Sequence, residues 1–137
     1  AAARKFAIET VVFVNAEIKL IKCIVNGILV DLSANTLGAL APVRFFDLVD
    51  EACGKNHLFK RSVIVLKAWS TYESRILASH QSLLSTYALQ VMLLYVINVN
   101  HDSIHTPLQA LYLFLQTYSD FDWETYGISA TRRFQVL

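Results

Sequence analysis

Side chains that could bind an anion or a nucleic acid are concentrated in the middle of the chain. Four basic residues lie close together in the sequence, Lys55, Lys60, Arg61 and Lys67. The formal net charge is only +1, so there is no global basic field that would attract a polyanion. Any contact with phosphate groups must therefore come from a local cluster such as this one.

Histidines and cysteines do not form a metal-binding motif. His80, His101 and His105 come without helical ligand spacing and without a cysteine partner, so we do not expect a histidine metal site. Cys23 and Cys53 lie far apart in apolar runs, where a buried free thiol is the usual state. This use of cysteine indicates an intracellular, reducing compartment, and an organelle is compatible with it.

The composition is unusually apolar for a soluble domain. Apolar residues make up 55% of the chain and charged residues 17%, against typical shares of about 45–50% and about 25%. Residues 76–101 contain no aspartate, glutamate, lysine or arginine, but His80, Gln81, Ser85 and Gln90 interrupt the apolar run, and the uninterrupted part is too short for a membrane helix. We expect no membrane partner, and either extensive burial or contact with another protein.

The first part of the chain has the pattern of β-strands. Val11–Val14 and Ala16–Val25 are rich in β-branched residues, and Asn26-Gly27 separates them from a third run, Ile28–Leu32. Asn-Gly is the preferred pair for a two-residue hairpin turn because both residues need positive φ. With this turn Val25 faces Ile28, and the register places Lys22 opposite Asp31 on one face of the sheet.

The rest of the chain has the pattern of helices, and four are expected. The first starts with Pro42 as an early helical residue and ends at Gly54. The second is capped by Asn56 and covers about 58–72, and the third is capped by Ser82 or Ser85 and reaches about Val99. A fourth starts at Thr106-Pro107 and ends near Tyr118. The fold class predicted from these elements is α+β, mainly α.

Four short segments, taken in order, resemble one family. They are Ile-Leu-Val-Asp-Leu-Ser-Ala-Asn at 28–35, Leu-Lys-Ala-Trp at 66–69, Leu-Ser-Thr-Tyr-Ala-Leu at 84–89 and Phe-Asp-Trp at 121–123. Together they resemble the poly(A)-polymerase-like nucleotidyltransferases of the PAP/OAS1-like superfamily, in particular the plant-type members. The resemblance implies that residues 1–36 are the β-strand end of a catalytic palm and that residues 37–137 are a helical substrate-binding-like domain.

The resemblance gives Asp31 the role of the third catalytic carboxylate. Nucleotidyl transfer uses two Mg²⁺ ions held by three carboxylates, and the other two members, together with the Gly-Ser turn of the family, are absent from this chain. Asp31 would therefore hold Mg²⁺ only with carboxylates from elsewhere, and Mg²⁺ is expected only if the complete protein is active. The alternative from the residues alone is a strand-end aspartate paired with Lys22.

The resemblance also implies a nucleotide-binding set. Lys67 matches the lysine that reaches the triphosphate, Thr86 the hydroxyl that bonds phosphate, and Tyr87 the ring that stacks on the base. Asn35 and Ser85 belong to the same matched segments. The structural alternatives are a solvated lysine, a serine that only caps its helix, and a tyrosine in the core.

Two positions depart from the family pattern. Thr71 stands where a second lysine is often found, and Pro42 lies near the position of a ribose-contacting asparagine. Both departures weaken the expected grip on a nucleotide. The two tryptophans, Trp69 and Trp123, are predicted to be core residues.

Two functional hypotheses follow, with a less favoured third. The chain is part of an enzyme that adds nucleotides to RNA 3′ ends and is inactive alone, or it is a non-catalytic structural or RNA-contacting subunit of a ribonucleoprotein such as an organellar ribosome. The third is a helical protein-binding module. The partners expected are RNA, an NTP, and a missing palm half or another protein against the hairpin edge, whose unpaired backbone groups invite pairing.

Overall fold

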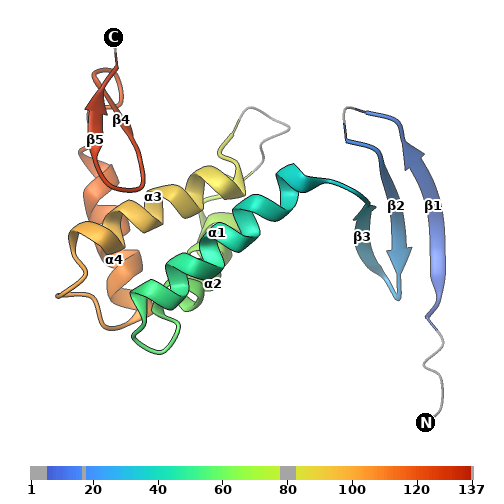
Figure 1. The fold of residues 1–137 in the computed structure, drawn as a ribbon, viewed down its shortest axis with the longest axis horizontal. Helices are drawn as coiled ribbons and strands as arrows, with labels where there is room; N and C mark the ends of the chain where they lie inside the picture. Colours follow the sequence, from blue (N-terminus) through green and yellow to red (C-terminus); the bar gives the residue numbers. More distant parts are fainter. Residues whose placement is uncertain (1–5, 17, 78–82, 137) are drawn as a thin grey trace. The chain divides into compact units, whose positions relative to one another are not determined.

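The computed structural model describes residues 6–16, 18–77 and 83–136. These residues form a small three-stranded sheet, four α-helices and a short two-stranded hairpin, in that order (Figure 1). The predicted α+β, mainly helical fold is therefore confirmed. The chain divides into two compact units, Ala1–Val43 and Arg44–Leu137. The predicted domain division after residue 36 stays a prediction.

The sheet has the predicted hairpin at its centre. Its strands β1 (Ile8–Val14), β2 (Leu20–Val25) and β3 (Ile28–Ser33) are antiparallel in the order β1-β2-β3. Asn26 and Gly27 both have positive φ, 51° and 78°, as this two-residue turn requires. Lys22 lies opposite Asp31, which confirms the predicted register.

The start of the second strand was predicted too early. The β-branched pattern suggested a strand from Ala16, whereas β2 starts at Leu20. The reason is that β1 and β2 are antiparallel neighbours with Val14 opposite Leu20, so the chain must reverse direction between these residues. A run of β-formers does not show where such a reversal falls.

One face of the sheet is wholly apolar. The register places nine apolar residues on it, because side chains at alternate positions share a face. Only Cys23, at its centre, is buried, while Ile8, Val11, Phe13 and Ile28 are each more than 60% exposed. The full set is Ile8, Val11, Phe13, Ile21, Cys23, Val25, Ile28, Val30 and Leu32.

Helix α1 (Leu37–Cys53) begins earlier than predicted. Pro42 lies inside it rather than at its first turn. An internal proline has no N–H to donate to the carbonyl four residues back, here that of Gly38. The lost hydrogen bond and the ring clash destabilise the helix by about 3 kcal/mol. The preceding residues are mostly leucine and alanine, whose high helix propensity favours helix before the proline as well.

Helix α2 (Leu58–Ala68) is capped in a way that the sequence did not suggest. Asn56 was the predicted cap, but it has φ 55° and lies in a left-handed stretch with Lys55 and His57, whereas a capping residue needs extended geometry. The carboxylate of Asp50 in α1 accepts the Lys60 N–H at 3.0 Å instead. The helix then continues as a π-helical turn, η1 (Trp69–Glu73).

Helices α3 (Thr86–Val99) and α4 (Pro107–Ser119) start as predicted. Ser85 caps α3 by accepting the Ala88 N–H at 3.1 Å, and the alternative cap Ser82 lies outside the described residues. Thr106 and Gln109 form a reciprocal capping box at the start of α4. These results confirm both predicted caps.

The chain after α4 forms a hairpin that the sequence did not predict. Strands β4 (Tyr126–Ile128) and β5 (Arg133–Gln135) pair antiparallel, with Gly127 opposite Phe134. A Cβ on Gly127 would lie 2.7 Å from the Phe134 ring, so a larger residue at this position would displace the ring.

The core lies between the helices of the second unit. Helix α2 packs against both α3 and α4, and Leu58, Leu93 and Val96 have no exposed surface. None of the helices within residues 6–16, 18–77 and 83–136 is long and apolar enough to cross a membrane. The described residues thus form a helical unit with its own core and a small sheet.

Candidate nucleotide-contact site

Within the described residues, the start of α3 presents backbone N–H donors without a partner, beside a hydroxyl group. Ser85 satisfies only one of the unpaired N–H groups there, that of Ala88, and the first turns of a helix leave four such groups. Thr86 is the first helical residue and is exposed. A helix amino terminus of this kind favours an anion through its N–H groups and its dipole.

Tyr87 provides an aromatic surface next to this helix end. Its ring is 51% exposed and lies 5.6 Å from the Phe46 ring of α1, at an interplanar angle of 56°. Phe46 is buried and in turn stacks on Phe59 at 5.6 Å. The tyrosine is therefore not a core residue: one side is supported by fixed aromatic rings and the other is accessible.

The sequence did not indicate the part played by Phe46. It stands next to Phe45 in α1, and only the helical phase distinguishes the buried ring from its exposed neighbour. The repeat of apolar residues toward Val49 and Cys53 gives that phase, and it could have identified Phe46 as inward-facing.

Lys67 lies in the last turn of α2. It is exposed and, among the described residues, its ammonium has no ion pair or hydrogen-bonded partner. That Lys67, Thr86 and Tyr87 line one cleft stays a prediction.

Most of the basic cluster predicted to bind phosphate is already engaged. Lys60 Nζ pairs with Asp47 Oδ1 at 2.9 Å, Lys55 donates to the carbonyl oxygens of His101 and Ile104, and Arg61 donates to the Asn56 carbonyl. The hydrogen bond with Asp47 raises the pKa of Lys60. These contacts hold loops and helices together. Of the four cations, Lys67 alone makes no such contact with the described residues.

Asp50 connects the basic cluster to the core. It is 1% exposed, and its Oδ2 lies 2.7 Å from His57 Nδ1. Burial alone raises the pKa of this carboxyl group, but the hydrogen bonds from His57 and the Lys60 N–H outweigh burial and lower it. The buried aspartate is therefore charged and structural.

Asp31 and Asn35 belong to the first unit, whereas the other predicted site residues belong to the second. Asp31 Oδ2 lies 3.4 Å from Lys22 Nζ, and both side chains are about half exposed, 49% and 46%. Asn35 has φ 58° in the turn before α1. Asp31 is thus paired with Lys22 on the neighbouring strand, as the alternative interpretation predicts.

A Mg²⁺ pair does not fit the residues described. Two metal ions need several carboxylates, and no group of three histidine, cysteine, aspartate or glutamate side chains gathers in the described part of the chain. Asp31 supplies one carboxylate, which already has a cationic partner. No metal-dependent step can be derived from these residues alone.

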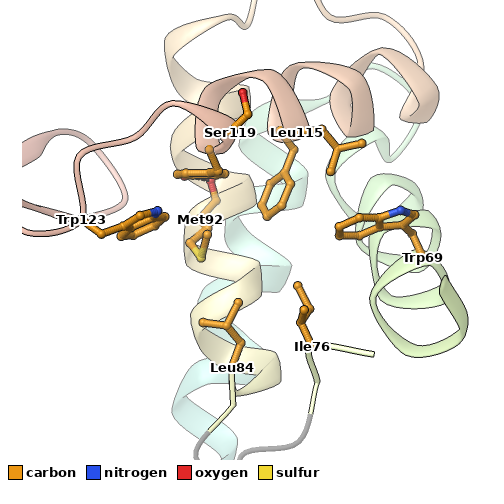
Figure 2. A pocket seen from close by; sticks show the side chains of 9 residues that line it. Trp69, Ile76, Leu84, Met92, Leu115, Ser119 and Trp123 are labelled. Atoms are coloured by element: carbon orange, nitrogen blue, oxygen red, sulfur yellow. Dashed lines mark hydrogen bonds between the residues drawn. The ribbon is translucent and has the colours of Figure 1, made fainter. Parts of the chain in front are cut away.

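An apolar cavity in the second unit was not predicted. It has a volume of about 540 Å³ and lies between η1, the start of α3 and the end of α4. Trp123, predicted as a core residue, is 52% exposed at the edge of the cavity, because its ring stacks on the Tyr118 ring at 5.5 Å and not among the buried residues. Trp69 is partly buried against the core. Figure 2 shows the side chains that line the cavity and labels Trp69, Ile76, Leu84, Met92, Leu115, Ser119 and Trp123.

Comparison with known proteins identifies one family. Residues 53–136 match the profile of the PAP/OAS1 substrate-binding domain. The match covers α2, η1, α3, α4 and the β4–β5 hairpin, and therefore every predicted nucleotide-binding residue of the second unit. No curated protein is significantly similar to the chain.

Proposed function

We propose, from the premise that the chain belongs to the PAP/OAS1 substrate-binding domain family and is nucleotidyltransferase-like, that its helical unit binds a nucleotide for addition to an RNA 3′ end. The observation that carries the proposal is the start of α3. There an anion-binding helix end and a supported, half-exposed tyrosine are adjacent in the sequence. A phosphate group and a base are the two parts of a nucleotide that such a pair would hold.

Each residue has a separate task in this proposal. The Thr86 hydroxyl and the free N–H groups of the first turn bind phosphate, and the accessible face of Tyr87 stacks on the base. Lys67 contributes a flexible positive charge near the phosphates. Asp31 and Mg²⁺ enter only when further carboxylates are supplied, so the chain by itself is expected to bind but not to transfer.

Titration of the 137-residue chain with a fluorescent NTP analogue tests the binding step. Tyr87→Ala should weaken binding by about tenfold, because stacking of a base on an aromatic ring is worth about 1–3 kcal/mol. Tyr72→Ala is the matched control, since Tyr72 is 77% exposed on η1. Equal losses for both variants, or an unchanged affinity for Tyr87→Ala, would contradict the proposal.

A non-catalytic, RNA-contacting role is the second candidate. The ion pair between Asp31 and Lys22 favours this role. If Asp31 were a catalytic carboxylate, it would have to give up part of this ion pair to bind a metal ion. The NTP titration separates the two roles, because an RNA-contacting subunit does not need to bind an NTP. An incorporation assay with an RNA primer, NTP and Mg²⁺ or Mn²⁺ then tests whether the chain itself transfers nucleotides. We expect no product from this chain, and incorporation abolished by Asp31→Ala would show that it carries a complete active site.

A further inference from the structure

Helix α4 has an uncharged exterior that exposes large apolar side chains. Its thirteen residues include no aspartate, glutamate, lysine or arginine, although one side of the helix faces outward. A helix on the surface of a globular protein usually has a charged or polar outer face. Here Leu108, Tyr112 and Leu115 are 70%, 65% and 37% exposed, beside the exposed polar residues Gln109, Gln116 and Ser119.

These three residues form one continuous stripe. They follow the spacing i, i+4, i+7, which places them on the same side of the helix. With Ser119 the stripe runs for about 16 Å at about 1.5 Å per residue, which is three helical turns. This is the length and spacing against which another helix packs.

The apolar cavity lies at the carboxyl end of the stripe. Leu115 and Ser119 belong to its lining, and the indole rings of Trp69 and Trp123 reach toward it from opposite sides (Figure 2). The hydroxyl of Tyr118 donates to the Met92 carbonyl at 2.9 Å, and none of the nine lining residues is charged. The cavity therefore suits a large uncharged side chain.

Acidic side chains stand beside this end of the stripe. Asp120 directly follows Ser119, and Glu124 directly follows Trp123. Both are exposed, and neither has an ion pair within the described residues. Negative charge here opposes an RNA phosphate backbone and favours a positively charged partner.

We propose that this stripe, together with the cavity, is the docking surface for a basic amphipathic helix of a partner protein. The apolar face of that helix lies along Leu108, Tyr112 and Leu115, one of its large side chains fills the cavity, and its lysines or arginines face Asp120 and Glu124. Anchoring of helical side chains in a groove is a common mode of recognition. The proposal does not depend on the nucleotide site, which uses the start of α3.

A designed peptide of about 15 residues serves as the probe, with leucines and one phenylalanine at i, i+4, i+7 and i+11 and lysines elsewhere. We expect binding to the 137-residue chain, measured by fluorescence polarisation of the labelled peptide. A peptide with glutamates in place of lysines, and a scrambled peptide of the same composition, should each bind at least about tenfold more weakly.

Variants of the chain locate the binding surface. Leu115→Glu should weaken binding of the lysine peptide by about tenfold or more, and Asp120→Asn with Glu124→Gln should reduce both affinity and salt dependence. Leu40→Glu is the matched control because Leu40 is also an exposed helical leucine, on α1. Circular dichroism of each variant verifies that the helices remain folded.

Several results would overturn the proposal. Equal binding of the scrambled peptide would mean non-specific hydrophobic contact, and equal binding of the glutamate peptide would remove the role of the carboxylates. An unchanged affinity for folded Leu115→Glu would place the peptide elsewhere. If light scattering shows a dimer that Leu115→Glu converts to a monomer, a second copy of the chain is the occupant instead.

Discussion

The two units of the chain contain similar kinds of residue but bury them very differently. In the helical unit, Leu58, Leu93 and Val96 are completely buried in a common core. In the sheet, a face of nine apolar residues contains only one that is buried, Cys23. The helical unit is thus stabilised by its own core, whereas a three-stranded sheet needs another layer to cover its apolar face.

The largest expected effect comes from deleting a core side chain of the helical unit. Leu93→Ala removes a side chain with no exposed surface and should lower the free energy of unfolding by about 3 kcal/mol. The same change on the apolar face of the sheet, Leu32→Ala, removes a leucine that is 54% exposed and should change it by less than about 1 kcal/mol. Urea unfolding monitored by circular dichroism provides both values.

If the two leucine variants lose similar stability, the comparison between the units fails. Such a result would show that the sheet's apolar residues are packed in solution as tightly as the helical core. A partner that covers the apolar face of the sheet should increase the loss of stability caused by Leu32→Ala and leave the loss caused by Leu93→Ala unchanged.

An intermediate effect is expected from the buried carboxylate. Asp50→Asn removes the charge that pairs with His57 and caps α2, and it should lower the free energy of unfolding by about 1–3 kcal/mol. The pKa of Asp50 is lowered in the fold, so the carboxylate stabilises the protein above its unfolded pKa of about 3.9. That contribution is lost as the pH falls through the folded pKa.

Thermal unfolding over a series of pH values checks the direction of this effect. The difference in unfolding temperature between the natural chain and Asp50→Asn should be largest above about pH 4 and should become smaller below it. A difference that instead grows as the pH falls would mean that the carboxyl group is protonated in the folded protein.

The smallest effect is expected from the exposed ion pair of the sheet. Asp31→Asn removes the partner of Lys22, but both side chains are about half exposed, and such pairs contribute only about 0–1 kcal/mol. The unfolding midpoint in urea should therefore stay nearly unchanged, and any small loss should disappear in high salt. A loss as large as that of Asp50→Asn would mean that the sheet buries Asp31 in solution.

Sequence reasoning succeeded where the determining residues are close together in the chain. The Asn26-Gly27 turn fixes its own register and thereby places Lys22 opposite Asp31. The caps at Ser85 and Thr106 each depend on a backbone N–H three residues away. The four helices were also predictable, because their apolar repeats extend over many residues.

Sequence reasoning failed where the determining contact is made across the fold. The cap of α2 is supplied by Asp50 in the preceding helix, and no local pattern at Asn56 or His57 reveals it. The support of Tyr87 by Phe46 joins two helices that are not consecutive. The exposure of Trp123 and the cavity beside it likewise depend on the path of the chain after α4.

The π-helical turn after Lys67 affects how relatives of this chain can vary in length. The Ser74 N–H bonds to the Trp69 carbonyl, five residues back, at 3.1 Å, so the turn holds one residue more than an α-helical turn. Insertion of one residue into an α-helix produces such a turn, and the side chains after it are rotated by about 100° around the helix axis. Evolution could therefore insert or delete one residue here and re-aim Ile76 while the orientation of Lys67 is preserved.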